Sequence, residues 1–155
     1  MILPSPFDSL QMPPALASEF FAVISRFEYA MKESGYLYVN RFGRAAPDWE
    51  RFAADAPGLV HATPGSELSQ AIDFLNREPP QVQTGEHQWQ AVPLRGAAPI
   101  STALDAAQRV RNNLFHGGKH TPHSPPGRDE ALVRAALTLL LACASQCPVL
   151  QAAYV

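Results

Sequence analysis

The chain has 155 residues, 46% of them hydrophobic and 17% charged, which is typical of a single globular domain rather than of a disordered chain. The net charge of −2 argues against indiscriminate binding to nucleic acid. The sequence opens without the features of a signal peptide, and no apolar run approaches the roughly 18 residues that span a bilayer. We therefore expect a cytoplasmic protein without membrane contact.

Prolines mark the loops of this chain. Its 15 prolines are many for the length, and they cluster in residues 4–14, 79–99 and 122–126. We interpret residues 1–14 as an extended N-terminal arm of one domain that covers residues 1–155. Residues 79–99 are then a long Pro-rich connection, with a short strand near Trp89.

Hydrophobic periodicity predicts helices between these loops. In the first, residues 18–34, Ser18 is the expected N-cap, and Glu28 precedes Lys32 by four residues, the spacing of an ion pair. The other expected helices are residues 48–56, 66–78, 101–116 and 129–146. The first two of these begin at Asp48 and Ser66, and Ser101 is the expected cap of the third. The last is apolar on nearly every side, which indicates a central buried helix. Without a convincing alternation of period two, the sequence predicts an all-α bundle of four to five helices.

The cysteines and histidines do not form a convincing metal site. Cys143 and Cys147 have no second pair, so we interpret them as small core residues. His116, His120 and His123 have metal-like spacing, but glycines and a proline interrupt the helix that would align them. We therefore expect no metal and no cofactor.

The stretch Arg-Asn-Asn-Leu-Phe-His-Gly-Gly-Lys, residues 111–119, is the part of the chain best suited to chemistry on a phosphate. Residues 107–128 contain four cations and no acid, so the rest of the chain, with 8 cations and 14 acids, has a charge of −6. Arginine offers a planar fork of donors to phosphate oxygens, and histidine titrates near neutrality. A local basic segment of this kind can hold a phosphate on an otherwise acidic protein.

Two arginines are candidates for that role. One helix face carries four polar residues at positions i, i+3, i+4 and i+7, namely Arg109, Asn112, Asn113 and His116. Arg111 lies five residues before His116, so an ideal helix separates their directions by about 140°. The long arginine stem and the glycines after His116, which allow the last turn to unwind, reduce this separation. Helix periodicity alone slightly favours Arg109.

Residues 111–116 resemble the signature of HEPN domains, in which an arginine precedes a histidine by a few residues and a polar residue often follows the arginine. Residues 26–32 are similar to the opening helix of Apea-like HEPN proteins, and the order of the helices agrees. The resemblance extends from about Ser18 to Cys147. It favours Arg111 as the motif arginine because Asn112 follows it.

The resemblance implies a HEPN-like helical bundle that forms a homodimer, with the motifs of two copies facing each other. It implies a metal-independent endoribonuclease of a toxin–antitoxin or phage-defence system, whose partners are RNA and an antitoxin or other defence protein. Arg111 and His116 would be catalytic. The supporting or substrate-binding residues would be Asn112, Asn113, Arg109, Lys119 and Glu28. A non-catalytic RNA- or nucleotide-binding module, or an interaction subunit, is the alternative.

The chemistry of such a reaction suits these residue types. RNA cleavage by its own 2′-hydroxyl needs a base, an acid for the leaving oxygen, and positive charge at the phosphorane. Histidine suits either proton role, and arginine supplies the charge. One histidine does not easily serve as base and acid at once, whereas a dimer provides two.

Overall fold

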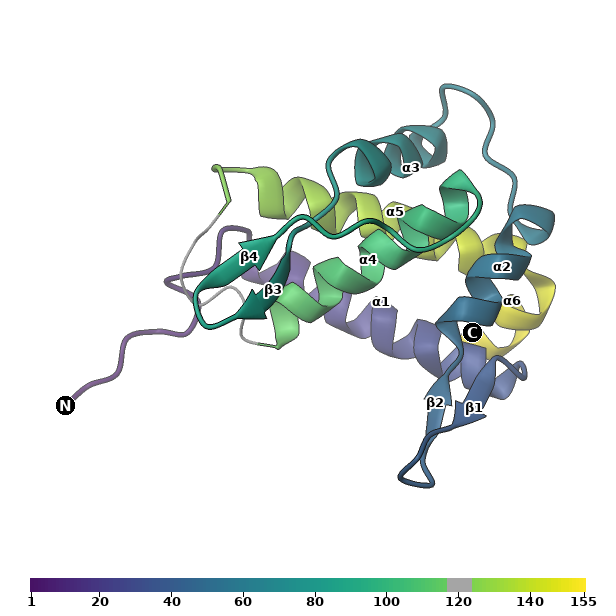
Figure 1. Cartoon of the computed structure of the whole chain (residues 1–155), viewed down its shortest axis with the longest axis horizontal. Helices are drawn as coiled ribbons and strands as arrows, with labels where there is room; N and C mark the ends of the chain where they lie inside the picture. The colour runs from purple at the N-terminus through teal and green to yellow at the C-terminus, as the bar shows by residue number, and fades with distance from the viewer. Residues whose placement is uncertain (117–123) are drawn as a thin grey trace.

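The computed structural model describes residues 1–116 and 124–155, which form a mostly helical fold (Figure 1). The helices in these residues are α1 (Pro14–Glu33), α2 (Trp49–Leu59), α3 (Glu67–Arg77), α4 (Pro99–Phe115), α5 (Arg128–Gln146) and α6 (Pro148–Tyr154). The strands are β1 (Leu37–Val39), β2 (Ala45–Pro47), β3 (Val82–Gly85) and β4 (Gln88–Gln90). The predicted helical character is confirmed, whereas the expectation of a purely α-helical chain with four to five helices is wrong.

The centre of the fold is α5, as its apolar sequence predicts. It packs against α1, α3, α4 and α6, and Leu139 and Leu140 are completely buried. The sequence did not predict α6, because Pro148 was interpreted only as the end of the preceding helix. Proline is also well suited to the first turn of a helix, where its missing N–H is not needed.

Helix α1 begins one turn earlier than expected. Pro14 occupies its first turn and Leu16 is buried in the core, so the extended arm is shorter than residues 1–14, and Ser18 lies inside the helix rather than at its cap. The predicted starts of α2 and α3 at Asp48 and Ser66 are confirmed. In the structure both residues are N-caps: Asp48 accepts from the Arg51 N–H and Ser66 from the Ser69 N–H, both at 3.1 Å.

The start of α4 also differs from its predicted position. Ser101 is not its cap, because α4 already begins at Pro99. The Ser101 hydroxyl instead donates to the carbonyl of Ala53 in α2 at 2.6 Å. Ser101 therefore joins α4 to α2, and this contact is a tertiary one that the pattern of a helix start does not reveal.

Both sheets are antiparallel hairpins. In the first, Tyr38 of β1 pairs with Ala46 of β2, and the hairpin projects from the helical body at the end of α1 (Figure 1). The second lies within the 79–99 connection and pairs Gln83 with Trp89, so the short strand expected near Trp89 is confirmed as one arm of a hairpin. With only three or four residues each, these strands are too short to show a convincing alternation.

Candidate functional site

The C-terminal half of α4 contains the predicted motif, and the helix stays regular up to Phe115. The backbone N–H of His116 donates to the carbonyl of Asn112 at 3.0 Å, which is the spacing of an intact helical turn. The turn before the glycines therefore does not unwind. Arg111 and His116 leave the helix axis about 140° apart and about 7.5 Å apart along it.

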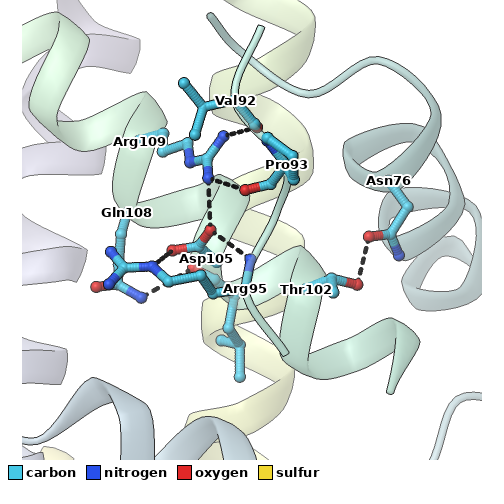
Figure 2. Close-up of polar contacts among 9 residues, drawn as sticks. Asn76, Val92, Pro93, Arg95, Thr102, Asp105, Gln108 and Arg109 are labelled. Atoms are coloured by element: carbon cyan, nitrogen blue, oxygen red, sulfur yellow. Dashed lines mark hydrogen bonds and ion pairs between the residues drawn. The ribbon is translucent and has the colours of Figure 1, made fainter. Parts of the chain in front are cut away.

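Arg109 is buried and binds its own chain (Figure 2). Its guanidinium donates to the carbonyl oxygens of Val92 and of Pro93, the latter at 2.7 Å, and forms a 3.0 Å ion pair with Asp105 one turn earlier. The side chains of Arg109 and Asp105 are each only 10% exposed. Asp105 also accepts from the backbone N–H of Arg95 at 3.0 Å. Arg109 thus fastens the end of the 79–99 connection to α4, which leaves it poorly placed to meet a phosphate from solvent.

Arg111 points in another direction and forms an ion pair with Glu28 of α1. The sequence predicts Lys32 as the partner of Glu28, but the structure brings Glu28 against Arg111. Glu28 is half-buried, with a side chain 21% exposed, and a carboxylate that loses part of its hydration is stabilised by a close cation. The Arg111 side chain keeps 24% of its surface exposed. The role of Glu28 as a support for the motif arginine is thus consistent with this contact.

The two asparagines have different surroundings. Asn113 donates its side-chain N–H to the carbonyl of Gln81 at 2.8 Å, and so holds the segment just before β3. Asn112 is exposed, and within the described part of the chain its side chain makes no hydrogen bond. His116 is exposed at the end of α4. Lys119, together with His120 and His123, lies outside the described residues.

An exposed face of α1 adjoins this end of α4. Phe115 packs edge-on against Phe21, with ring centroids 5.6 Å apart, yet Phe21 remains 60% exposed. Tyr29, two turns further along α1, is 50% exposed. Together with Ala22, Ser25 and Arg26 they line a shallow hollow of about 450 Å³. We call these five residues the α1 surface.

The sequence pattern does not predict the α1 surface as part of the site. Phe21 and Tyr29 lie off the apolar stripe that predicts the buried side of the helix, whose members include Phe20, Ile24 and Phe27. The available signal was two large aromatic residues on the opposite, otherwise polar side of an amphipathic helix. The Phe21 and Tyr29 side chains are 60% and 50% exposed, whereas Phe20 and Phe27 in the same helix are completely buried.

Two further properties concern metals and membranes. Residues 1–116 and 124–155 contain no group of three or more His, Cys, Asp or Glu side chains placed to hold a metal ion. In those same ranges no single helix is long and apolar enough to cross a bilayer, although α5 and α6 taken together, bent by 104°, reach the required hydropathy.

Compared with protein-family models, curated proteins and solved structures, the chain matches none of them. The resemblance to HEPN domains therefore stays a prediction that rests on the motif and the order of the helices.

Proposed function

We propose that two copies of this chain form a metal-independent endoribonuclease of the HEPN type, acting in a toxin–antitoxin or phage-defence system. Arg111 of one copy and His116 of the other act on the same RNA phosphate. The observation that carries the proposal is the Arg111–Glu28 pair, which fixes a partly exposed guanidinium on the helix that ends at an exposed His116.

The regular end of α4 favours a site built from two chains. Because Arg111 and His116 diverge by about 140° on one helix, a single copy does not readily direct both at one phosphate. A two-fold arrangement brings the Arg111 of each copy toward the His116 of the other. In each of the two sites one histidine takes the 2′-hydroxyl proton, and the leaving oxygen takes its proton from water.

The α1 surface is the proposed contact between the copies. Phe21 and Tyr29 expose aromatic rings beside the motif, and aromatic side chains are enriched at interfaces between proteins. Phe21 rests on Phe115, the residue directly before His116, so a copy bound at this surface lies next to the histidine.

Glu28 holds the motif arginine in place rather than taking part in proton transfer. A guanidinium fixed before the substrate arrives needs little reorganisation when charge develops on the phosphorane. Arg111→Ala should lose about 2–4 kcal/mol of transition-state stabilisation, the scale observed for one preorganised donor. Glu28→Gln, which keeps an acceptor but removes the charge, should lose less than Arg111→Ala.

The decisive experiment mixes two inactive variants. Arg111→Ala and His116→Ala proteins are incubated separately and together with total RNA in EDTA. If each site takes its arginine and histidine from different copies, a mixed dimer regains one intact site, and an equimolar mixture should recover about one quarter of wild-type activity. The products should end in a 2′,3′-cyclic phosphate or its opened form.

Other outcomes separate the alternatives. A mixture as inactive as its components, with wild-type protein active, would place each site within one chain and refute the composite arrangement. An active His116→Ala protein with a slightly lower melting temperature would show that His116 has only a structural role at the helix end. A cation there contributes about 0.3–1 kcal/mol to the free energy of unfolding. RNA binding without any cleavage by the wild type would leave the non-catalytic binding module.

A further inference from the structure

The β1–β2 hairpin exposes apolar and aromatic side chains that nothing in the described chain covers. Phe42 at its tip is 71% exposed, and Tyr38 on β1 is 52% exposed. The residue opposite Tyr38 is the small Ala46, so the cross-strand neighbour leaves much of the ring open. Leu37 and Val39 are exposed as well. Exposed apolar clusters of this kind mark binding surfaces.

The base of the hairpin is firmly attached to the helical body. The Asp48 N–H donates to the carbonyl of Tyr36 at 2.9 Å, and the Tyr36 hydroxyl donates to Asp55 at 2.9 Å. The Tyr36 ring packs edge-on against the buried Phe52, with centroids 5.2 Å apart. The Arg51 guanidinium donates to the carbonyl of Gly35. A hairpin fixed in this way presents its tip in one orientation.

The turn at the tip is also preorganised. The side-chain oxygen of Asn40 accepts from the backbone N–H groups of Phe42 at 2.9 Å and of Arg44 at 3.1 Å. Gly43 has a φ of +72°, which other residues rarely adopt. The side chains of Arg41, Phe42 and Arg44 are therefore displayed on an ordered turn, so that little conformational entropy is lost when a ligand binds.

The charge of this element is opposite to that of the rest of the chain. Residues 34–47 contain Arg41 and Arg44 and no acid, so the remaining residues have 10 cations and 14 acids, a charge of −4. The Arg41 guanidinium lies over the Phe42 ring, 4.8 Å from its centroid. Positive charge interleaved with open aromatic rings is the combination by which proteins bind single-stranded nucleic acid, since rings stack on bases and cations meet phosphates.

We propose that the β1–β2 hairpin binds single-stranded RNA, stacking bases on Tyr38 and Phe42 and meeting phosphates with Arg41 and Arg44. This inference rests on the proposed function for the identity of its ligand, and it supplies contacts to RNA bases, which Arg111 and His116 do not provide. RNA fits better than an apolar protein partner because two of the exposed side chains are planar rings and both charges are guanidinium groups.

The test measures binding separately from cleavage. Fluorescence anisotropy is followed with a labelled 2′-O-methyl oligouridine of about 12 nucleotides, which lacks the attacking hydroxyl and spans a typical single-strand site. Tyr38→Ala and Phe42→Ala should each weaken binding by about 5- to 150-fold, the range for loss of one stacked base. Phe42→Trp should retain binding, whereas Phe42→Leu, which is apolar but cannot stack, should not. Replacing either arginine by glutamine should reduce the slope of log affinity against log salt by about 0.7.

Phe7→Ala is the matched control, because Phe7 is also exposed but lies in the N-terminal arm, and it should bind as the wild type does. Wild-type protein that fails to bind the oligonucleotide, or hairpin variants that bind it unchanged, would overturn the inference. So would wild-type binding to vesicles of phosphatidylcholine and phosphatidylserine that Phe42→Ala abolishes while its oligonucleotide binding stays unchanged, which would indicate a membrane-surface role. If the wild type cleaves RNA and the hairpin variants bind the oligonucleotide as the wild type does, only the hairpin inference is refuted. If oligonucleotide binding depends on the hairpin but the wild type cleaves no RNA, only the proposed ribonuclease activity is refuted.

Discussion

Replacing Arg109 with alanine should destabilise the fold severely, because three acceptors depend on this buried cation. The Arg109 guanidinium donates hydrogen bonds to the carbonyls of Val92 and Pro93 and forms an ion pair with the carboxylate of Asp105 (Figure 2). Removing one partner of a buried ion pair costs about 3–5 kcal/mol. Asp105 retains the backbone N–H of Arg95, which favours the lower part of that range.

A loss of this size is a large part of the roughly 5–15 kcal/mol that stabilises a domain. For a chain of this length it should lower the melting temperature by roughly 6–20 °C. Arg111→Ala is the comparison, two residues along the same helix. Its ion pair is partly exposed, so Glu28 regains water when the partner is removed, and we expect a smaller loss of about 1–2 kcal/mol.

Urea unfolding and thermal melts of the two variants measure these differences, and cleavage is assayed well below both melting temperatures. Arg109→Ala should be unstable but active where it is folded, whereas Arg111→Ala should lose only about 1–2 kcal/mol of stability and be inactive. An Arg109→Ala protein that melts within about 2 °C of the wild type would refute the structural role assigned to this side chain. Loss of cleavage by folded Arg109→Ala would show that both arginines act on the phosphate.

Three other properties follow from particular positions. Burial raises the pKa of Tyr36 to about 12, so the unfolded chain, with a pKa near 10, loses this proton first. Stability should therefore fall as pH rises from about 10 to 12, and Tyr36→Phe should reduce that fall in urea melts. Burial likewise raises the pKa of Cys143 to about 12, so its thiol should not react with a disulfide reagent near pH 8 until the protein unfolds. Gly96→Ala should lose about 1–3 kcal/mol, because φ is +136° and a Cβ would lie 2.9 Å from the Thr102 nitrogen, whereas Gly58→Ala, with no atom within 4 Å, should be neutral or stabilising in the same melts.

The helices were predictable because they depend on local signals. Apolar periodicity is a property of neighbouring residues, and α2 and α3 begin directly after Asp48 and Ser66, where the sequence places their starts. Helix ends that depend on tertiary contacts were not predictable in this way. Ser101 satisfies its hydroxyl through Ala53, which is 48 residues away in the sequence.

The two arginines show the same limit within the site. A helical wheel places Arg109 near the direction of His116, but it contains no information on which chain segment covers that side of the helix. The structure covers it with Val92 and Pro93. One signal was present in the sequence, since Asp105 precedes Arg109 by four residues, the spacing of an ion pair within a helix.

The contact between Arg111 and Glu28 joins residues 83 positions apart, and no local pattern predicts it. It also has an energetic consequence for the site. An arginine paired with a carboxylate attracts a phosphate less strongly than a free arginine does, so the pair weakens binding of the ground state. In return the guanidinium is held in one orientation, and a fixed donor contributes most when charge increases in the transition state. In the proposed ribonuclease, Arg111 is therefore suited to catalysis more than to affinity. The proposal leaves the capture of RNA to another part of the surface, and the hairpin of Tyr38, Arg41, Phe42 and Arg44 has the exposed rings and positive charge for it.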